Sequence, residues 1–405
     1  MQKVFIPNII GHKTMKLYSS ISRNKLSLII AAGIICALIM FYPAWGTAAE
    51  KPQRQLFVTV IQDQPVLSSS AAIDKLIDTA QKTGVGVLFI QVYRANQSWF
   101  ASQNADQSPY EAGPKNLSHD PFALLIRRAH SAGIQVHAWL NILSLSNNQE
   151  ALLLKKYGPE ILTRNTQEKQ KLEDYKIDNQ YFLEPGDPRV RQEILAMVED
   201  LLQGYPQLDG VQFDYIRYPD KNPFYGYTKI NLQRFKDSTG CEKFQEKNPL
   251  WQDWKRRQVT ELLELLVKKT RQIRPDIQVS ATACAPFVRA YYEAFQDWPS
   301  WLNSGLVDFV TLMSYSAQNS EFDKDILEAK AKTNDLKKLS IAVGAYKFLR
   351  SPENFKKQFN ACEKEKCRAC VIFHYGSLLE NPELGARLST PSIPHTPQKA
   401  RRDSL

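Results

Sequence analysis

The stretch YFLEPGDPRVRQEILAMVEDLLQGYPQLDGVQFDYIRYP (181–219) joins an amphipathic helix to a buried strand. Asp187 and Pro188 are typical of the N-cap and the first position of a helix. The run GVQFDYI (210–216) has the near-continuous apolar composition of a strand buried on both faces. The stretch therefore predicts one helix–strand unit of a parallel sheet.

The same alternation continues on both sides of this stretch. Helices are expected at residues 71–84, 120–133, 187–205, 251–275 and 351–366. Strands are expected at residues 56–62, 86–93, 135–143, 210–216, 277–283, 307–315, 339–346 and 369–375. Strands that alternate with helices indicate a parallel sheet, and eight of them predict an α/β fold, a (β/α)8 TIM barrel. An open doubly wound sheet would normally have a glycine-rich turn after its first strand, where this chain has VIQDQPVLSSS.

The N-terminal residues 1–49 are predicted to be a signal peptide or an N-terminal membrane anchor. Five basic residues and no acidic one precede the uncharged run 26–41, and small residues follow it at 46–49. A membrane span needs about 20 apolar residues, which favours the signal peptide. We expect residues 50–385 to form the barrel outside the cytoplasm, either periplasmic, secreted or anchored facing outward. Residues 386–405 are predicted to be a disordered, Pro-rich, basic tail.

Charge and cysteine content exclude several classes of protein. Much of the net charge of +10 lies in the two termini, so the body has no electrostatic footprint for nucleic acid. Contact with a membrane is expected only through an uncleaved N-terminal segment. The clustered Cys362, Cys367 and Cys370 are one ligand short of a structural zinc site, and a local disulfide among them is expected in an oxidising compartment. No metal and no cofactor are predicted.

Barrel enzymes build their sites at the C-terminal ends of the strands. Asp214 is the acid at the end of the fourth predicted strand. Aromatic and hydrogen-bonding side chains occupy the other strand ends and its surroundings, and we predict that they bind substrate: Arg94, His137, Trp139, Asn141, Tyr215, Arg217, Tyr315 and His374. Such side chains suit the apolar faces and hydroxyl rims of a sugar. In the alternative interpretation, His137 is a core histidine and the aromatic side chains fill the barrel.

The 181–219 stretch resembles the glycosyl hydrolase-like family 10 and related glycosyl hydrolase-like proteins with an FDYIRYP-type fourth strand. Residues 91–102, 120–141 and 295–315 are similar to further segments of that family in the same order. The resemblance implies an extracytoplasmic TIM-barrel glycosidase that acts on bacterial glycans, with peptidoglycan favoured. It also points to Asp214, which matches the acidic residue at the end of the family's fourth strand and is predicted to be the nucleophile or the base.

The sequence departs from the family pattern where a second carboxyl group is needed. Glycoside hydrolysis normally uses two carboxyl groups, and one of them is protonated. Much of the family has a second acid where this chain has Tyr215, and ATACAPF (281–287) has no carboxylate after strand five. Glu184 is the predicted partner of Asp214. Weaker alternatives are Asp63, Glu111 and Glu293.

Two further functions remain open. A catalytically silent TIM barrel that binds cell-envelope glycan would explain the missing acid. A metal-dependent hydrolase or deacetylase is disfavoured, because no His-x-His pair stands at a strand end. The glycosidase is the preferred hypothesis.

Overall fold

The computed structural model describes residues 53–113, 120–220 and 224–389. The signal peptide or anchor predicted at residues 1–49, and most of the tail predicted at 386–405, lie outside the described residues. Within the described ranges, no helix is long and apolar enough to cross a membrane.

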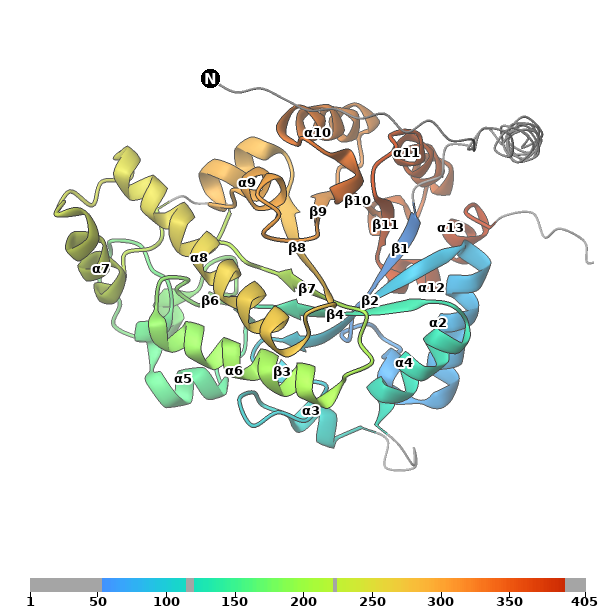
Figure 1. Ribbon diagram of the computed structural model, residues 1–405, viewed down its shortest axis with the longest axis horizontal. Helices are drawn as coiled ribbons and strands as arrows, with labels where there is room; N and C mark the ends of the chain where they lie inside the picture. The colour runs from blue at the N-terminus through green and yellow to red at the C-terminus, as the bar shows by residue number, and fades with distance from the viewer. Residues whose placement is uncertain (1–52, 114–119, 221–223, 390–405) are drawn as a thin grey trace, which may run out of the picture. The chain divides into compact units, whose positions relative to one another are not determined.

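Eight parallel strands form a closed barrel, as predicted (Figure 1). They are β1 (Gln53–Val58), β2 (Val85–Arg94), β4 (Gln135–Asn141), β7 (Gly210–Asp214), β8 (Gln278–Cys284), β9 (Phe309–Ser314), β10 (Leu339–Gly344) and β11 (Ala369–Phe373). Neighbours along the chain pair in sequence, and the barrel closes because β1 pairs with both β2 and β11. A short strand, β3 (Gln97–Ser98), pairs antiparallel with the end of β2.

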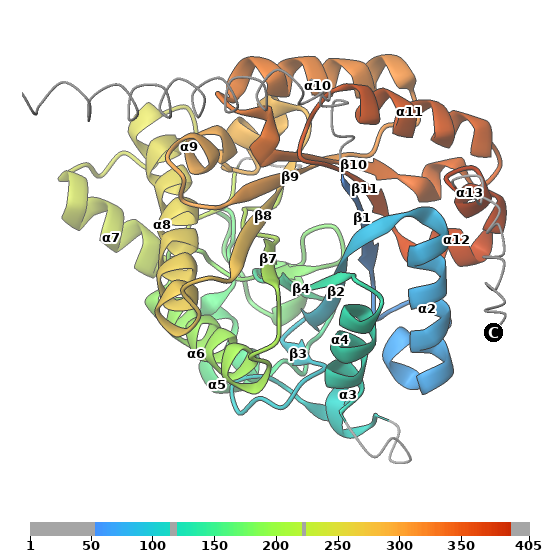
Figure 2. The same cartoon turned by 45° about the vertical axis from the view of Figure 1, so that its right-hand side comes forward.

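Helices surround the strands, which lie at the centre of the view in Figure 2. The main outer helices are α2 (Ser70–Thr83), α4 (Pro121–Ser131), α6 (Pro188–Gly204), α8 (Pro249–Ile273), α9 (Trp298–Asn303), α10 (Asn319–Lys332) and α11 (Pro352–Lys364). Shorter or peripheral helices are α3 (Ser108–Glu111), α5 (Leu152–Tyr157), α7 (Lys229–Thr239), α12 (Tyr375–Glu380) and α13 (Pro382–Ala386). Asp187 caps α6 as expected, because its side chain accepts a hydrogen bond from the Arg189 amide over 2.9 Å.

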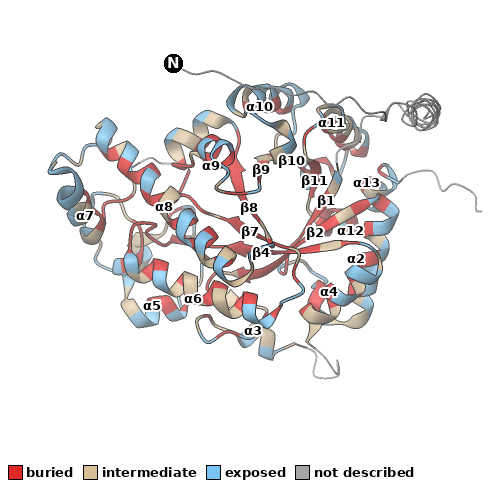
Figure 3. Ribbon diagram, in the orientation of Figure 1, coloured by how far each residue is buried: buried red, intermediate tan, exposed pale blue. Residues whose placement is uncertain are grey.

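Most buried apolar side chains lie between the strands and the helices, and the strands themselves are almost wholly buried (Figure 3). A smaller cluster fills the inside of the barrel: Phe57, Val87, Phe89, Trp139, Phe309, Ala342 and Val371. These bulky side chains fill the barrel below the C-terminal ends of its strands. The space for a ligand is therefore at the C-terminal end.

The sequence did not predict α7 or α10. Helix α10 buries only Phe322, Ile326 and Ala329, and charged residues make up most of its remaining surface. This weak apolar periodicity explains why the helix was missed. The omission matters because α10 contributes two carboxyl groups to the site described below.

The segment between β4 and α6 is a long insertion. It begins with β5 (Ser144–Ser146), which pairs with β6 (Tyr181–Phe182) just before α6. The insertion also contacts the end of β2, because the Asn148 side-chain amide donates to the carbonyl of Ala95 over 2.8 Å. The insertion therefore lies at the C-terminal end of the barrel.

The clustered cysteines form one local disulfide, as expected. Cys362 on α11 is bonded to Cys370 on β11. The Cys367 thiol is buried, with its Sγ atom 3.8 Å from that of Cys362. The disulfide therefore ties the last outer helix of the barrel to its last strand.

Candidate active site

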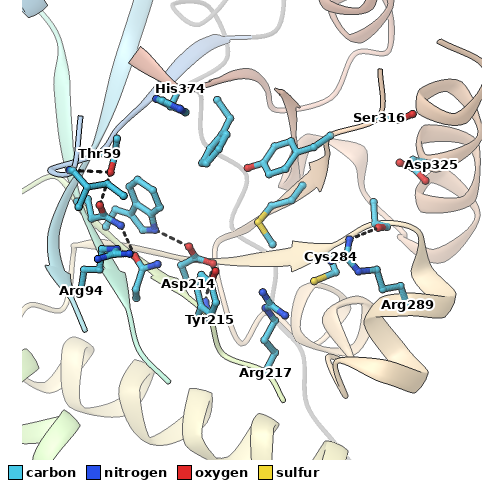
Figure 4. Close-up of a pocket in the computed structure, with 18 of the residues that line it drawn as sticks. Thr59, Arg94, Asp214, Tyr215, Arg217, Cys284, Arg289, Ser316, Asp325 and His374 are labelled. Atoms are coloured by element: carbon cyan, nitrogen blue, oxygen red, sulfur yellow. Dashed lines mark hydrogen bonds between the residues drawn. The ribbon is translucent and has the colours of Figure 1, made fainter. Parts of the chain in front are cut away.

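A cavity of about 810 Å³ opens at the C-terminal ends of the strands (Figure 4). Its volume falls within the roughly 300–1,000 Å³ that is typical of ligand pockets. Polar and charged side chains that line it are Thr59, Gln62, Gln91, Arg94, Asn141, Asp214, Arg217, Arg289, Ser316, Glu321, Asp325 and His374. Aromatic and other lining residues are Ile61, Trp139, Tyr215, Cys284, Ala285, Pro286, Met313, Tyr315 and Phe373. The cavity is where a barrel enzyme is expected to bind its substrate.

Three hydrogen bonds hold the carboxylate of Asp214 in one orientation. Its Oδ2 atom accepts a hydrogen bond from the indole Nε1 of Trp139 over 2.9 Å. Its Oδ1 atom accepts from the Tyr215 backbone amide over 2.7 Å and from the Thr282 hydroxyl over 2.5 Å. Although only 4% of Asp214 is exposed, it lines the cavity. A preorganised carboxylate of this kind can act on a bound substrate without first having to be ordered.

The backbone directly after Asp214 is strained. Tyr215 has a φ of 55°, in the left-handed region that costs a non-glycine residue roughly 1–2 kcal/mol. This conformation turns the chain at the end of β7, and it accompanies the hydrogen bond from the Tyr215 amide to Asp214. Strain of this sort is often retained where it positions functional groups.

Gln296, which no sequence pattern indicated, connects the ends of β7 and β8. Its side-chain nitrogen donates to the carbonyls of Ile216 and Thr282, and its oxygen accepts from the Cys284 amide over 3.0 Å. Gln296 is wholly buried. It fixes the two strand ends that carry Asp214 and its hydroxyl donor.

A chain of hydrogen bonds also orients Asn141, which is paired in register with Asp214. The Thr59 hydroxyl donates to Oε1 of Gln91 over 2.7 Å. Nε2 of Gln91 then donates to Oδ1 of Asn141 over 2.9 Å. With its oxygen engaged in this way, Asn141 presents its Nδ2 group as a donor for a ligand beside Asp214.

Two of the cavity's three arginines share one carboxylate. Asp220 forms ion pairs with Arg217, over 2.7 Å, and with Arg289. Burial opposes ionisation of Asp220, but the two guanidinium groups outweigh it and hold the pKa of this carboxyl below its usual value. Arg217 also lies over the ring of Tyr215, 4.5 Å from its centroid. These contacts stiffen one wall of the cavity.

The thiol of Cys284 belongs to the same wall. Burial raises the pKa of Cys284 to about 11, so the thiol is protonated at neutral pH. A protonated thiol is a poor nucleophile, which disfavours chemistry through a cysteine at this site.

Aromatic side chains form another part of the cavity wall. Tyr315 stacks on Phe373 with ring centroids 4.6 Å apart, and its hydroxyl is buried with no hydrogen-bond partner among the described residues. Buried hydroxyls rarely lack a partner, so this one is suited to bind a ligand group. His374 lines the cavity nearby, and burial lowers its pKa. Its ring is therefore neutral at pH 7 and can donate or accept one hydrogen bond at each nitrogen.

His137 does not line the cavity. It is 1% exposed and packs edge-on against Phe89, with ring centroids 5.3 Å apart, inside the barrel. Burial lowers the pKa of His137 to about 3. This position matches the core-histidine interpretation, since a ligand in the cavity would have to pass the layer that contains Trp139 to reach it.

Glu184 lies behind the site rather than in it. Its side chain is fully buried, it is not among the residues that line the cavity, and it accepts a hydrogen bond from the Tyr218 hydroxyl over 2.5 Å. Burial raises the pKa of Glu184 to about 7, as a general acid requires. Direct action on a substrate would additionally require this carboxyl to become exposed.

Two carboxyl groups from α10, Glu321 and Asp325, line the cavity. Burial raises the pKa of Asp325, and the neighbouring Glu328 and Glu321 add to this effect, although a hydrogen bond from Ser314 opposes it. Figure 4 shows Asp325 and Asp214 on opposite sides of the cavity. Neither residue of α10 was predicted from the sequence, because neither stands at a strand end. The weaker alternatives Asp63, Glu111 and Glu293 do not line the cavity.

The sequence of the barrel matches a known family. The model of the family Glycosyl hydrolase-like 10 matches residues 54–360. The chain belongs to this family. Similar proteins include the glycosyl hydrolase DigH of Escherichia coli K12, which is 24% identical over 307 residues that make up 67% of each chain. The glycosyl hydrolase YngK of Bacillus subtilis is 24% identical over 261 residues, 60% of this chain and 48% of the relative.

Solved structures with a similar fold include two glycosidases. The catalytic domain of β-amylase from Paenibacillus polymyxa has a TM-score of 0.54 and 12% identity, covering 80% of this chain and 93% of the other. The α-L-fucosidase isoenzyme 2 from Paenibacillus thiaminolyticus has a TM-score of 0.56 and 12% identity, covering 83% and 48%. At this level of identity the likeness shows the TIM-barrel fold alone. Family membership supports a glycosyl hydrolase-like function.

Proposed function

We propose that the protein is a glycoside hydrolase that cleaves a bacterial envelope polysaccharide, with Asp214 as its essential carboxylate. The observation that carries the proposal is the carboxylate of Asp214, which three donors hold at the edge of a cavity at the C-terminal end of the barrel. A peptidoglycan-type glycan is the favoured substrate, since the sequence resemblance implies it. The N-terminal sequence supports a location outside the cytoplasm.

Asp214 would act as the nucleophile or the general base, and a second carboxyl group would protonate the leaving oxygen. Asp325 combines a place in the cavity wall with a pKa that burial raises. Burial raises the pKa of Glu184 to about 7, but this residue is buried behind Tyr218. Both residues are therefore candidates for the acid, and they can be distinguished by mutation.

The first experiment compares the full-length wild type with Asp214→Asn. Both proteins are incubated with a panel of bacterial and plant glycans, including peptidoglycan with and without its peptide stems, and released fragments are identified by mass spectrometry. We expect fragments from the wild type and none from the variant. Equal release by the two proteins would contradict the role of Asp214.

Aryl glycosides with an activated leaving group identify the acid, because such a leaving group needs no protonation. We expect the variant of the true acid, Asp325→Asn or Glu184→Gln, to lose activity on the natural glycan and to retain it on the activated glycoside. Asp214→Asn should lose both activities. Glu383 on α13 is exposed and forms an ion pair with Arg387, and it provides the control variant Glu383→Gln.

A second candidate function is a barrel that binds envelope glycan without cleaving it. The observation in its favour is that two positions where a glycosidase could carry its acid have none. Tyr215 follows Asp214, and Cys284, Ala285 and Pro286 line the cavity at the end of β8 and directly after it. This function predicts that wild type and Asp214→Asn bind the same polymer and that neither releases fragments.

A further inference from the structure

Arg94 is a charged side chain of the cavity that has no partner in the part of the chain that the structure describes. The guanidinium lines the cavity, but it forms no hydrogen bond or ion pair with any other described residue. Arg217 and Arg289, in contrast, both engage Asp220. Burial lowers the pKa of Arg94, which reflects the cost of holding this charge partly away from water. A half-buried charge without a partner is stabilised when an anion arrives.

The backbone holds Arg94 in this position by an anchored turn. Arg94 pairs with Gln97 across the β2–β3 hairpin, and Ala95 and Asn96 form its turn with φ angles of 56° and 61°. Both angles are positive, as in a type I′ turn, although neither residue is glycine. The Asn96 side chain accepts a hydrogen bond from the Leu153 amide over 3.0 Å, and it also donates to the Tyr93 hydroxyl. A turn with positive φ angles therefore lies directly after Arg94, the residue that lines the cavity.

The surroundings of Arg94 limit what it can bind. In Figure 4, Asp214 and Tyr215 lie between Arg94 and Arg217. A multiply charged anion would be repelled by the Asp214 carboxylate, whereas one negative charge balances the one unpaired guanidinium. A planar carboxylate also matches the two parallel N–H groups of a guanidinium. The Nδ2 group of Asn141, oriented by Gln91, is a further donor in the same cavity.

We propose that Arg94 binds a carboxylate group on the sugar next to the bond that is cleaved, so that the preferred substrate is an acidic glycan. The inference rests on the proposed glycosidase function and specifies its substrate class. The carboxylate could belong to a uronic acid, where it is attached to the ring, or to a lactyl ether such as that of muramic acid. Arg94 is then a specificity-determining residue.

Binding to the inactive variant Asp214→Asn tests this inference without requiring hydrolysis. The probes are a tetragalacturonate and a muramic acid-containing tetrasaccharide free of peptide, each compared with its carboxyl-reduced form. Full-length Asp214→Asn should bind at least one acidic probe about ten- to a hundredfold more tightly than the reduced form, which corresponds to one charged hydrogen-bonding contact. The probe that shows the difference identifies the source of the carboxylate.

The double variant Asp214→Asn/Arg94→Gln should bind the acidic and reduced forms of that probe equally. Arg94→Lys should retain part of the difference, and Arg257→Gln, at a guanidinium 74% exposed on α8, should retain all of it. Because Arg94 has no partner to lose, Arg94→Gln should also unfold at the same temperature as its parent or higher.

The inference is overturned if both probes bind equally well before and after reduction, if neither acidic probe binds, or if Arg94→Gln keeps the difference. The proposed glycosidase function fails separately, if the wild type releases no fragment from any glycan. A carboxylate-dependent difference in binding without hydrolysis would support Arg94 as the specificity residue of a binding protein.

Discussion

The indole Nε1 of Trp139 donates a hydrogen bond to Oδ2 of Asp214 over 2.9 Å. Trp139 is itself 4% exposed and packs edge-on against Phe57 and Phe373, with ring centroids 4.8 Å and 6.2 Å apart. The core of the barrel therefore sets the direction of the donor, and the donor sets the direction of the carboxylate. Packing and the proposed catalysis are coupled through this one side chain.

Replacing Trp139 with Phe should lower kcat on the cleaved glycan about 10–100-fold, because a hydrogen bond to a charged group is lost while an aromatic ring remains. Trp301→Phe is the matched control. Its Nε1 donates to the Thr260 hydroxyl over 2.9 Å, and it does not line the cavity. The control should lose stability but keep kcat per folded molecule. Equal kcat for Trp139→Phe and wild type would contradict the positioning role.

The buried carboxyl of Glu184 should make stability depend on pH. Burial raises its folded-state pKa from 4.5 to about 7. Between these two values the unfolded chain releases the proton and the folded protein keeps it, so stability falls as pH rises through this window and levels off above it. The loss from this group amounts to about 3 kcal/mol.

Urea unfolding of wild type and Glu184→Gln between pH 4.5 and 8 measures this effect. The stability of Glu184→Gln relative to the wild type should rise with pH across the window, because a neutral amide has no proton to lose. Glu383→Gln, at an exposed carboxyl on α13, is the control and should show no such trend. A difference that does not change with pH would mean that Glu184 ionises normally in the fold.

The Cys362–Cys370 disulfide should contribute about 2.5 kcal/mol to stability, because it closes a short loop in the unfolded chain. Cys362→Ser should lower the midpoint of urea unfolding, and adding reductant should lower that of the wild type to a similar value. Cys367→Ser leaves the disulfide intact and is the control. If Cys362→Ser unfolds at the wild-type urea concentration, then the disulfide does not stabilise the barrel.

Gly210 at the start of β7 has no room for a side chain. A Cβ atom there would lie 2.4 Å from the His137 ring, which packs inside the barrel between Phe89 and Phe309. Gly210→Ala should therefore cost about 1–3 kcal/mol through overpacking. Adding His137→Ala should make the effect of Gly210→Ala smaller, a coupling that a double-mutant cycle measures.

Gly204 provides the comparison for that cycle. No heavy atom outside its own helix and chain neighbours lies within 4 Å of a Cβ placed there, so Gly204→Ala should leave the free energy of unfolding nearly unchanged. Equal effects of alanine at Gly204 and Gly210 would contradict the proposed clash.

The strand-end rule predicted many of the residues that line the cavity, but not how deep each side chain lies in the barrel. His137, Trp139 and Asn141 share one face of β4, because side chains alternate along a strand. All three point into the barrel, but at successive depths: His137 lies in the core, Trp139 contacts both core and cavity, and Asn141 lines the cavity at the end of the strand. Strand periodicity gave the face of each residue, and register with the neighbouring strands decided its depth.

The sequence by itself determined the order of the eight strands, five of the helices and the position of Asp214 at a strand end, since these follow from local pattern and parallel pairing. It also indicated the family, through the similarity of several segments. Only the tertiary structure decided which other groups join Asp214. Glu321 and Asp325 line the cavity from α10, where Asp325 accepts a hydrogen bond from Ser314 at the end of β9, and no strand-end signal marks them. Likewise, contacts between segments far apart in the chain bury Glu184 and leave Arg94 without a partner among the described residues. Local sequence carries no record of such contacts.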